Sequence, residues 1–276
     1  LNFNVGVFVG LAGILVCSFL GGMRAVTWTQ VAQYIILIIA YLTPVVWMSY
    51  KVTGVPIPEL MYGQVLQQIH VLEGTLGVVK SHTTPFVQMT TWNFLALTFC
   101  LMVGTAALPH ILMRYYTTPN VREARMSVGW SLFFIFLLYF TAPSYAAFAK
   151  YTVYHDVVGT QIANLPNWIA TWGKLGLTKV VDLNGDGILQ LAELTINTDV
   201  VVLATPEIAG MPYVVTGLVA AGGLAAALST ADGLLLTIAN ALSHDLYYKM
   251  INPNATTVKR LFIARTLLLV VAVIAA

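Results

Sequence analysis

Long apolar runs separated by short polar stretches dominate this chain. Each complete run has about 20 or more residues, long enough at a helical rise of about 1.5 Å per residue to cross a hydrocarbon core of about 30 Å. Five such runs lie at residues 4–22, 25–47, 86–112, 126–148 and 212–242, and a sixth begins at Leu261. The pattern predicts five complete transmembrane helices and the start of another.

The composition agrees with a membrane protein. Hydrophobic residues make up 58% of the 276 positions and charged residues only 9%, whereas a soluble domain carries about 25% charged residues. We therefore expect an all-α polytopic membrane protein whose first partner is the lipid bilayer. The net charge of +2 is small and dispersed, so nucleic acid is not an expected partner. The chain starts at Leu1, and its last run, 266–276, is too short to span, so we expect a fragment of a longer protein.

Basic residues fall unevenly on the two sides of the predicted spans. Short cytoplasmic connections are enriched in lysine and arginine. The side that fits this rule holds eight of the thirteen lysine and arginine residues: Arg24, Arg114, Arg122, Arg125, Lys249, Lys259, Arg260 and Arg265. The loops 49–85 and 149–211, which carry eight of the eleven acidic residues, are then external. We expect a multi-pass protein of the cell (plasma or inner) membrane.

Two features modify the simple picture of straight spans and open loops. A structureless loop of about 60 residues is unusual, so we expect helices within 149–211, one of them an interfacial helix at 167–175. Proline and glycine interrupt the spans at 104–109, 141–143 and 217–223. Such positions are typical of discontinuous transporter helices, but also of kinks and close helix packing.

Three polar residues lie deep in the last complete span. Ser229, Thr230 and Asp232 interrupt an otherwise apolar stretch, and Ser229 is 17 residues after Pro212 and 16 before Asp245, near the midplane. A carboxylate at that depth costs at least a few kcal/mol and indicates a functional role. A buried pair with a basic residue or backbone donors is the alternative for Asp232. The hydroxyls suit a small cation, but they also suit bonding to the preceding turn or to another helix.

The sequence resembles the sodium:solute symporter family, most closely its cation/acetate symporter-like (monocarboxylate) branch. The resemblance is carried, in the expected order and spacing, by GGMRAVTWTQVAQ at 21–33, LPHILMRYYTTPNVREAR at 108–125 and LSTADGLLLTIANALSHDLYYK at 228–249. It implies an inverted-repeat fold of five plus five helices. Residues 1–276 would form a single transporter domain, with core helices four to eight and the start of nine.

The resemblance also implies a sodium site. Ser229 and Thr230 match the family's hydroxyl ligand pair, and Ala226 matches a position that offers its backbone carbonyl. The remaining ligands come from the first core helix, which this fragment lacks. Many members carry Asp where Gln30 stands here, at a place associated with a second cation. Our hypothesis is that Asp232 supplies that missing charge beside Gln30, as a second cation or coupling site.

An EF-hand-like segment at 182–193 lies in the long external loop. It fits the pattern D-x-[DN]-x-[DN]-G-x5-E at every defined position. Gly187 allows the sharp turn that brings the ligands together. The expected calcium ligands are Asp182, Asn184, Asp186, the Ile188 carbonyl and Glu193. The alternative is an acidic turn followed by a helix start, and the expected role of calcium is to fold the loop.

These features favour a secondary active transporter that couples Na⁺ entry to uptake of a small organic anion, a monocarboxylate such as acetate. Leu108 and His110 lie near positions where relatives line the substrate cavity or inner gate; a structural role at the cytoplasmic edge is the alternative. A cation channel and a calcium-responsive sensor remain alternative functions. An enzyme is not expected, because H-E-x-x-H, G-x-S-x-G and a membrane-depth aspartate pair are all missing from the sequence. The oligomeric state is left open.

Overall fold

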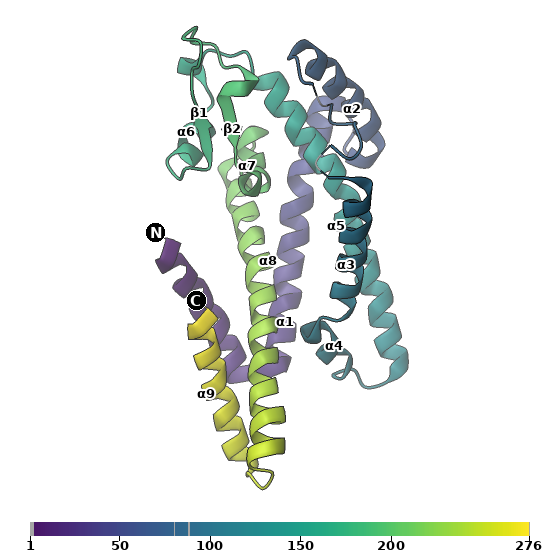
Figure 1. The fold of residues 1–276 in the computed structure, drawn as a ribbon, viewed down its shortest axis with the longest axis vertical. Helices are drawn as coiled ribbons and strands as arrows, with labels where there is room; N and C mark the ends of the chain where they lie inside the picture. The colour runs from purple at the N-terminus through teal and green to yellow at the C-terminus, as the bar shows by residue number, and fades with distance from the viewer. Residues whose placement is uncertain (1–2, 80, 88, 276) are drawn as a thin grey trace. The chain divides into compact units, whose positions relative to one another are not determined.

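The structure, a computed structural model, describes residues 3–79, 81–87 and 89–275 (Figure 1). It is mainly helical, as predicted. The longer elements are α1 (Phe3–Thr53), α2 (Pro58–Thr75), α3 (Thr91–Ala106), α4 (Pro109–Tyr115), α5 (Val121–Asp156), α6 (Asn167–Gly173), α7 (Val201–Ile208), α8 (Tyr213–Asn240), a π-helical continuation (Ala241–Ile251) and α9 (Thr257–Ala275). A short 3₁₀ turn lies just before α6. Between α6 and α7 the chain forms further 3₁₀ turns and two three-residue strands, β1 (Thr178–Val180) and β2 (Leu194–Ile196).

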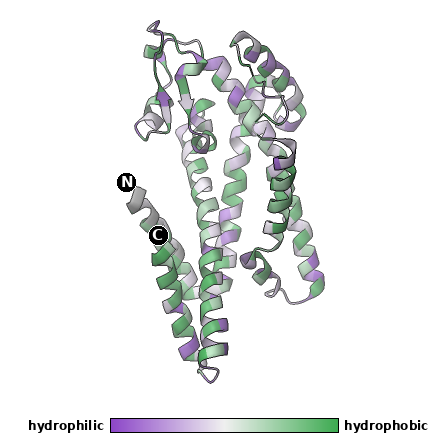
Figure 2. Ribbon diagram, in the orientation of Figure 1, coloured by the Kyte–Doolittle hydropathy of each residue, from purple (hydrophilic) through white to green (hydrophobic). Residues whose placement is uncertain are grey.

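Three helical stretches of the described residues are long and apolar enough to cross a membrane: Leu15–Thr53, Val121–Asp156 and Tyr213–Ile251. A fourth results if α3 and α4, which meet at a bend of 43°, form one broken span. Figure 2 shows that hydrophobic residues predominate along these helices and along α9. The all-α polytopic membrane class is confirmed. The other expected span, 4–22, is the part of α1 that precedes Gly22.

The expected interruptions have different outcomes. The one at 104–109 is a true break, because α3 ends at Ala106 and α4 begins at Pro109. At 141–143 and 217–223 the helices are not interrupted, since α5 and α8 continue through them, which leaves the alternative of kinks or close helix packing at these positions. Proline has a φ that a helix accepts and loses only one hydrogen bond there, and glycine weakens a helix without ending it.

Gly22 separates the first two predicted spans inside α1. Its φ of +55° and ψ of −149° lie outside the helical region, in a conformation that only glycine adopts readily. The two parts of α1 therefore follow each other without a loop. This explains how the apolar runs 4–22 and 25–47 can be separate spans within one continuous element.

The described residues form two compact units, each with its own core. One unit contains residues up to 37, 97–128 and 224–276. In its core, Leu235 and Ala239 of α8 pack with Leu268 and Ala272 of α9. Leu11, Leu15 and Phe19, from the part of α1 before Gly22, cover this cluster. Small residues at the contact let the helices approach closely.

The other unit contains residues 38–96 and 129–223. Its main core joins three helices, through Val45 of α1, Val65 and Ile69 of α2, and Tyr145 and Phe148 of α5. The expected external loop 49–85 thus holds a helix, α2, that packs on two of the long helices. A buried apolar face of this kind, rather than helix propensity, stabilises such a helix.

The long loop 149–211 has a core of its own. The helix expected at 167–175 is found as α6. Its Trp168 belongs to a buried cluster that also contains Leu189, Val153 of α5 and Ala204 of α7. Trp172 donates its indole N–H to Glu207 at 3.0 Å. The antiparallel pairing of β1 with β2 was not predicted. Strands of three residues are too short to leave a periodic signal.

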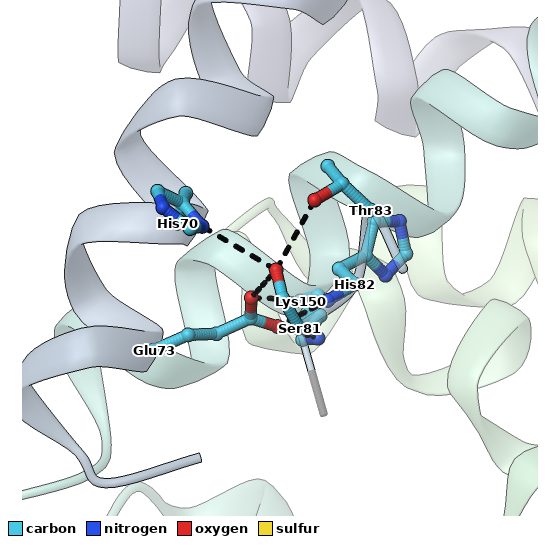
Figure 3. Close-up of polar contacts among 6 residues, drawn as sticks. All are labelled: His70, Glu73, Ser81, His82, Thr83 and Lys150. Atoms are coloured by element: carbon cyan, nitrogen blue, oxygen red, sulfur yellow. Dashed lines mark hydrogen bonds and ion pairs between the residues drawn. The ribbon is translucent and has the colours of Figure 1, made fainter. Parts of the chain in front are cut away.

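A buried carboxylate organises the chain after α2 (Figure 3). Glu73 is only 2% exposed, and it accepts hydrogen bonds from Lys150 Nζ at 2.5 Å, from Ser81 Oγ at 2.7 Å and from the His82 backbone N–H at 2.9 Å. Burial by itself raises the pKa of Glu73, but these hydrogen bonds outweigh it and the pKa lies below its ordinary value of 4.5. The charged form of Glu73 therefore ties residues 81–82 to α2 and α5.

We expect Glu73→Gln to lower the free energy of unfolding by about 1–3 kcal/mol, because it leaves donors on Lys150 and Ser81 poorly matched in a buried site. A lowered pKa stabilises the fold above the ordinary glutamate pKa, and this stabilisation is lost as the pH falls through the folded-state value. Thermal unfolding in detergent should show the defect at pH 7, and the defect should shrink progressively as the pH falls below 4.5. Asp156→Asn, at an exposed carboxylate, is the matched control; an equal loss in both variants would contradict the prediction.

Candidate functional site

The three expected sodium ligands lie together on α8. Ser229 Oγ donates to the Ala226 carbonyl at 2.9 Å, and Thr230 Oγ1 approaches the same oxygen at 3.4 Å. Each hydroxyl keeps lone pairs that can face a cation. Ser229 is half-buried and Thr230 is exposed, so this group of oxygen atoms is exposed on one side. The arrangement fits a small hard cation, and it equally contains the back-bonding that serine and threonine make in helices.

Gln30 ties α1 to this group. Its side chain is 8% exposed, and its Nε2 donates to the Ser229 backbone carbonyl at 2.7 Å. The carbonyl belongs to one of the two hydroxyl residues, so the amide fixes that turn of α8 against α1. The other amide atom, Oε1, is buried and has no hydrogen-bond partner in the described parts of the chain.

Asp232 lies at the centre of the apolar helix. It is 1% exposed, and it is 19 residues from Tyr213 and 19 from Ile251. The Ser18 hydroxyl, from the part of α1 before Gly22, donates a short hydrogen bond to Oδ1. The direct partner of the carboxylate is thus a serine that the sequence did not indicate, and the hypothesis that Asp232 acts together with Gln30 stays a prediction.

Three polar side chains lie close to Gly233, the residue after Asp232. A Cβ atom at this position would lie 3.4 Å from Arg114 Nη2, 3.7 Å from His110 Cδ2 and 3.8 Å from Gln30 Nε2. These are ordinary van der Waals distances, so the guanidinium and the imidazole of α4 lie against this turn of α8, and an alanine would also fit there.

The break before α4 determines where its side chains lie. Leu108 is the N-cap residue, with an extended ψ of 115°, and Pro109 begins the helix. His110 and Arg114 are four residues apart and therefore lie on one face of α4. His110 Nδ1 is buried without a hydrogen-bond partner among the residues that the structure describes. His110, one of the two expected gate residues, thus lies beside Gly233. Leu108, the other, lies at the bend between α3 and α4.

The sequence analysis missed Ser18, Arg114 and Gly233. Arg114 was counted as one of the basic residues of a cytoplasmic connection. Its spacing of four from His110, within a motif already singled out, was the available signal for a shared helix face. Ser18 lies 214 residues from Asp232 and carried no signal of its own.

The EF-hand-like segment forms the tight turn that its glycines predict. Gly185 and Gly187 have φ values of +73° and +71°, and the Asp182 carboxylate accepts their backbone N–H groups at 2.8 and 3.1 Å. Asn184 and Asp186 accept backbone N–H groups in the same turn. The motif has two further carboxylates after Asp182, namely Asp186 and Glu193.

Glu193 does not converge with the other oxygens. It is 3% exposed, and its two carboxylate oxygens accept the backbone N–H groups of Leu183 and Gln190 at 2.8 and 2.9 Å. Within the described ranges, no group of three or more His, Cys, Asp or Glu side chains is arranged to hold a metal ion. A calcium ion would have to draw Glu193 away from these two donors. Calcium binding by Asp182, Asn184, Asp186, Ile188 and Glu193 stays a prediction.

Comparisons with known proteins agree on one family. The model of the sodium:solute symporter family matches residues 1–171 and 175–276. An uncharacterized symporter of Cupriavidus necator is 40% identical, over 99% of this chain and 54% of its own length. A monocarboxylic acid transporter of Corynebacterium glutamicum is 27% identical, over 97% of this chain and 44% of its own length.

The chain therefore spans about half the length of these curated relatives. No solved structure matches it. The family match covers almost every residue, including the segments that hold Gln30, Arg114, Ser229 and Asp232. The chain belongs to the sodium:solute symporter family.

Proposed function

We propose that the protein couples the entry of Na⁺ to the uptake of a small organic anion, a monocarboxylate such as acetate. The observation that carries the proposal is the group of Ala226, Ser229 and Thr230 oxygens on one turn of a helix long enough to span a membrane. Membership of the sodium:solute symporter family supports the coupling ion. The monocarboxylic acid transporter of C. glutamicum supports the substrate class.

Coupling follows from thermodynamic linkage. If Na⁺ at Ser229 and Thr230 stabilises a state with higher affinity for the solute, the solute must raise the affinity for Na⁺ by the same factor. Movement of helices around the site then exposes it to the other side of the membrane. The oxygens of α8 make up part of a coordination shell, so further ligands come from elsewhere in the full-length protein.

The remaining polar residues have roles in the same proposal. Asp232 and Gln30 form a second cation or coupling group, which shares the Ser229 turn with the sodium ligands. Leu108 and His110 line the inner gate, at the bend between α3 and α4. An anionic solute prefers hydroxyl donors, helix N-termini and a guanidinium to a site rich in carboxylates.

We expect Ser229→Ala and Thr230→Ala, made in the full-length protein, each to raise the Na⁺ concentration for half-maximal uptake by about tenfold or more. Losing one oxygen ligand that is worth about 1.4 kcal/mol has this effect. The measurement is uptake of radiolabelled acetate into proteoliposomes over a range of Na⁺ concentrations. Thr266→Ala is the control, because Thr266 makes the same helical back-bond, to Phe262, on α9. Uptake that does not depend on Na⁺ in the unsubstituted protein would overturn the proposal.

The same vesicles separate the alternative functions. A cation channel would pass radiolabelled Na⁺ down its gradient without any solute. A calcium-responsive sensor would show no solute uptake, but its conformation would change with external calcium. A symporter requires both substrates on the same side, so Na⁺ entry rises when the monocarboxylate is added.

We further propose that the segment 182–193 is a weak external calcium site that stabilises its loop. The supporting observation is the sharp turn at Gly185 and Gly187, which places the Asp182, Asn184 and Asp186 side chains on one short stretch. External calcium is concentrated, so weak affinity suffices. The bonds that Glu193 makes to Leu183 and Gln190 compete with the ion and keep the affinity low.

We expect 2–5 mM calcium to raise the unfolding temperature of the full-length protein by a few degrees, as a bound ligand stabilises the folded state. Asp186→Asn should abolish this calcium-dependent increase while it leaves the loop core, centred on Leu189, intact. Magnesium at the same concentration is the ion control. An identical unfolding temperature with calcium and with a chelator would reject the site.

A further inference from the structure

A cleft of about 460 Å³ lies among the segment that follows α2, the first turn of α3 and the last turns of α5. These parts all belong to the same compact unit. The polar part of its lining consists of Lys150, His82, Ser81 and Thr84. Small-molecule sites are clefts of this size that combine apolar walls with a few polar groups. None of the described residues that line the cleft belongs to the groups proposed above for Na⁺, calcium or the inner gate.

Lys150 presents a positive charge to this cleft. Its side chain is 23% exposed, whereas that of its partner Glu73 is only 2% exposed (Figure 3). The cleft therefore meets the ammonium group of this ion pair rather than the carboxylate. An ammonium group has three N–H donors, and the one that Glu73 accepts leaves others for a second carboxylate.

His82 adds a group whose charge depends on pH. Its backbone N–H donates to Glu73 at 2.9 Å, and this bond fixes the residue in the lining of the cleft. Burial and the nearby charge of Lys150 lower the pKa of His82, and the charge of Glu73 opposes them. His70 is connected to this group through the Ser81 hydroxyl, at 3.4 Å. The imidazole of His82 is therefore mainly neutral at pH 7 and becomes charged as the pH falls below 6.5.

The rest of the lining is apolar and includes Phe86, Met89 and Phe94. The rings of Phe86 and Phe94 pack edge to face with their centroids 5.7 Å apart, and both residues are about half exposed. Phe86 has a φ of +56°. A bulky residue rarely adopts this conformation, which persists only where the surrounding structure holds it and is common at binding sites. The aromatic pair is thus a preformed apolar surface, and a hydrocarbon chain that covered it would release water.

We propose that this cleft binds a monocarboxylate that carries a hydrocarbon tail, at a second site separate from the transport site. The carboxylate accepts hydrogen bonds from Lys150 and His82, and the tail covers the Phe86–Phe94 pair. Because Glu73 balances most of the Lys150 charge, the polar contacts fix the orientation of the ligand and the tail supplies most of the affinity. The site extends the proposed function without depending on it, since its ligand binds without Na⁺.

The test measures the binding of radiolabelled hexanoate and acetate to the purified full-length protein by equilibrium dialysis, in a buffer without Na⁺. The unsubstituted protein should bind hexanoate about tenfold or more tightly than acetate, because each buried methylene adds affinity. Phe94→Ala should weaken hexanoate binding by about fivefold and leave acetate binding unchanged within about twofold. Lys174→Gln, at an exposed lysine of the loop 149–211, is the control and should bind both anions as the unsubstituted protein does.

Recognition of the carboxylate is tested with Glu73→Gln and Lys150→Gln together, since this double variant leaves no buried charge unpaired. Its hexanoate affinity should fall by about fivefold or more, whereas Lys150→Arg should retain it. In the unsubstituted protein the affinity should rise between pH 8 and pH 5.5, over which hexanoate stays ionised, and His82→Gln should abolish this rise. If the double variant does not fold, His82→Gln and Phe94→Ala carry the test.

The outcomes separate this inference from the proposed function. Hexanoate that does not bind without Na⁺, that binds no more tightly than acetate, or whose affinity ignores both Phe94→Ala and the charge variants overturns the site, while Na⁺-coupled uptake stands. Co-purification of phosphatidylglycerol that competes with hexanoate, and that is lost in the double variant, assigns the cleft to a lipid and also overturns it. Hexanoate binding as expected, with acetate uptake that ignores Na⁺, supports the site and overturns the symport.

Discussion

The need to compensate a charge buried at membrane depth governs the polar half of this molecule. Asp232 cannot be hydrated inside an apolar helix, so donors and charges must come from other parts of the chain. The Ser18 hydroxyl comes from one part of α1, the Gln30 amide fixes the adjacent turn from the other part, and Arg114 approaches from α4. The turn at Gly22 and the bend at Leu108 set the directions from which these segments reach α8.

The other unit meets the same constraint in a different way. Glu73 is as well buried as Asp232, but it has a direct ion pair with Lys150, whose side chain is 23% exposed. Contact with water at the lysine lowers the cost of burying that pair. Glu73 can therefore hold a short loop segment in place, whereas the environment of Asp232 is built from three helices. The difference follows from the access that each site has to water, and it gives Glu73 a structural role, whereas a coupling role is proposed for Asp232.

How far the sequence predicted these features depends on the range of the interaction. Apolar run lengths report the solvent around a helix, so the spans and the break before Pro109 were predictable. At Pro143 and at Gly217–Gly223 the sequence left open a break or a kink, and the helices continue, because helices in a packed environment tolerate these residues. Ser229, Thr230 and Ala226 were found through the family's pattern on one helix. Ser18 and Arg114 were not, since a contact between residues 214 positions apart leaves no local pattern.

Gln30 connects the two halves of the proposed site more closely than the sequence suggested. Its amide holds the carbonyl of Ser229, and the same amide lies near Gly233, where Arg114 also approaches the helix. A rotation of α8 that moved the hydroxyl pair would break this bond and shift Asp232 by the same angle, because both residues lie on one turn. In the proposed mechanism, sodium binding at the hydroxyl pair would therefore be mechanically linked to the position of the Asp232 carboxylate. A glutamine serves this purpose better than a carboxylate, since it donates to the carbonyl and adds no second negative charge to balance.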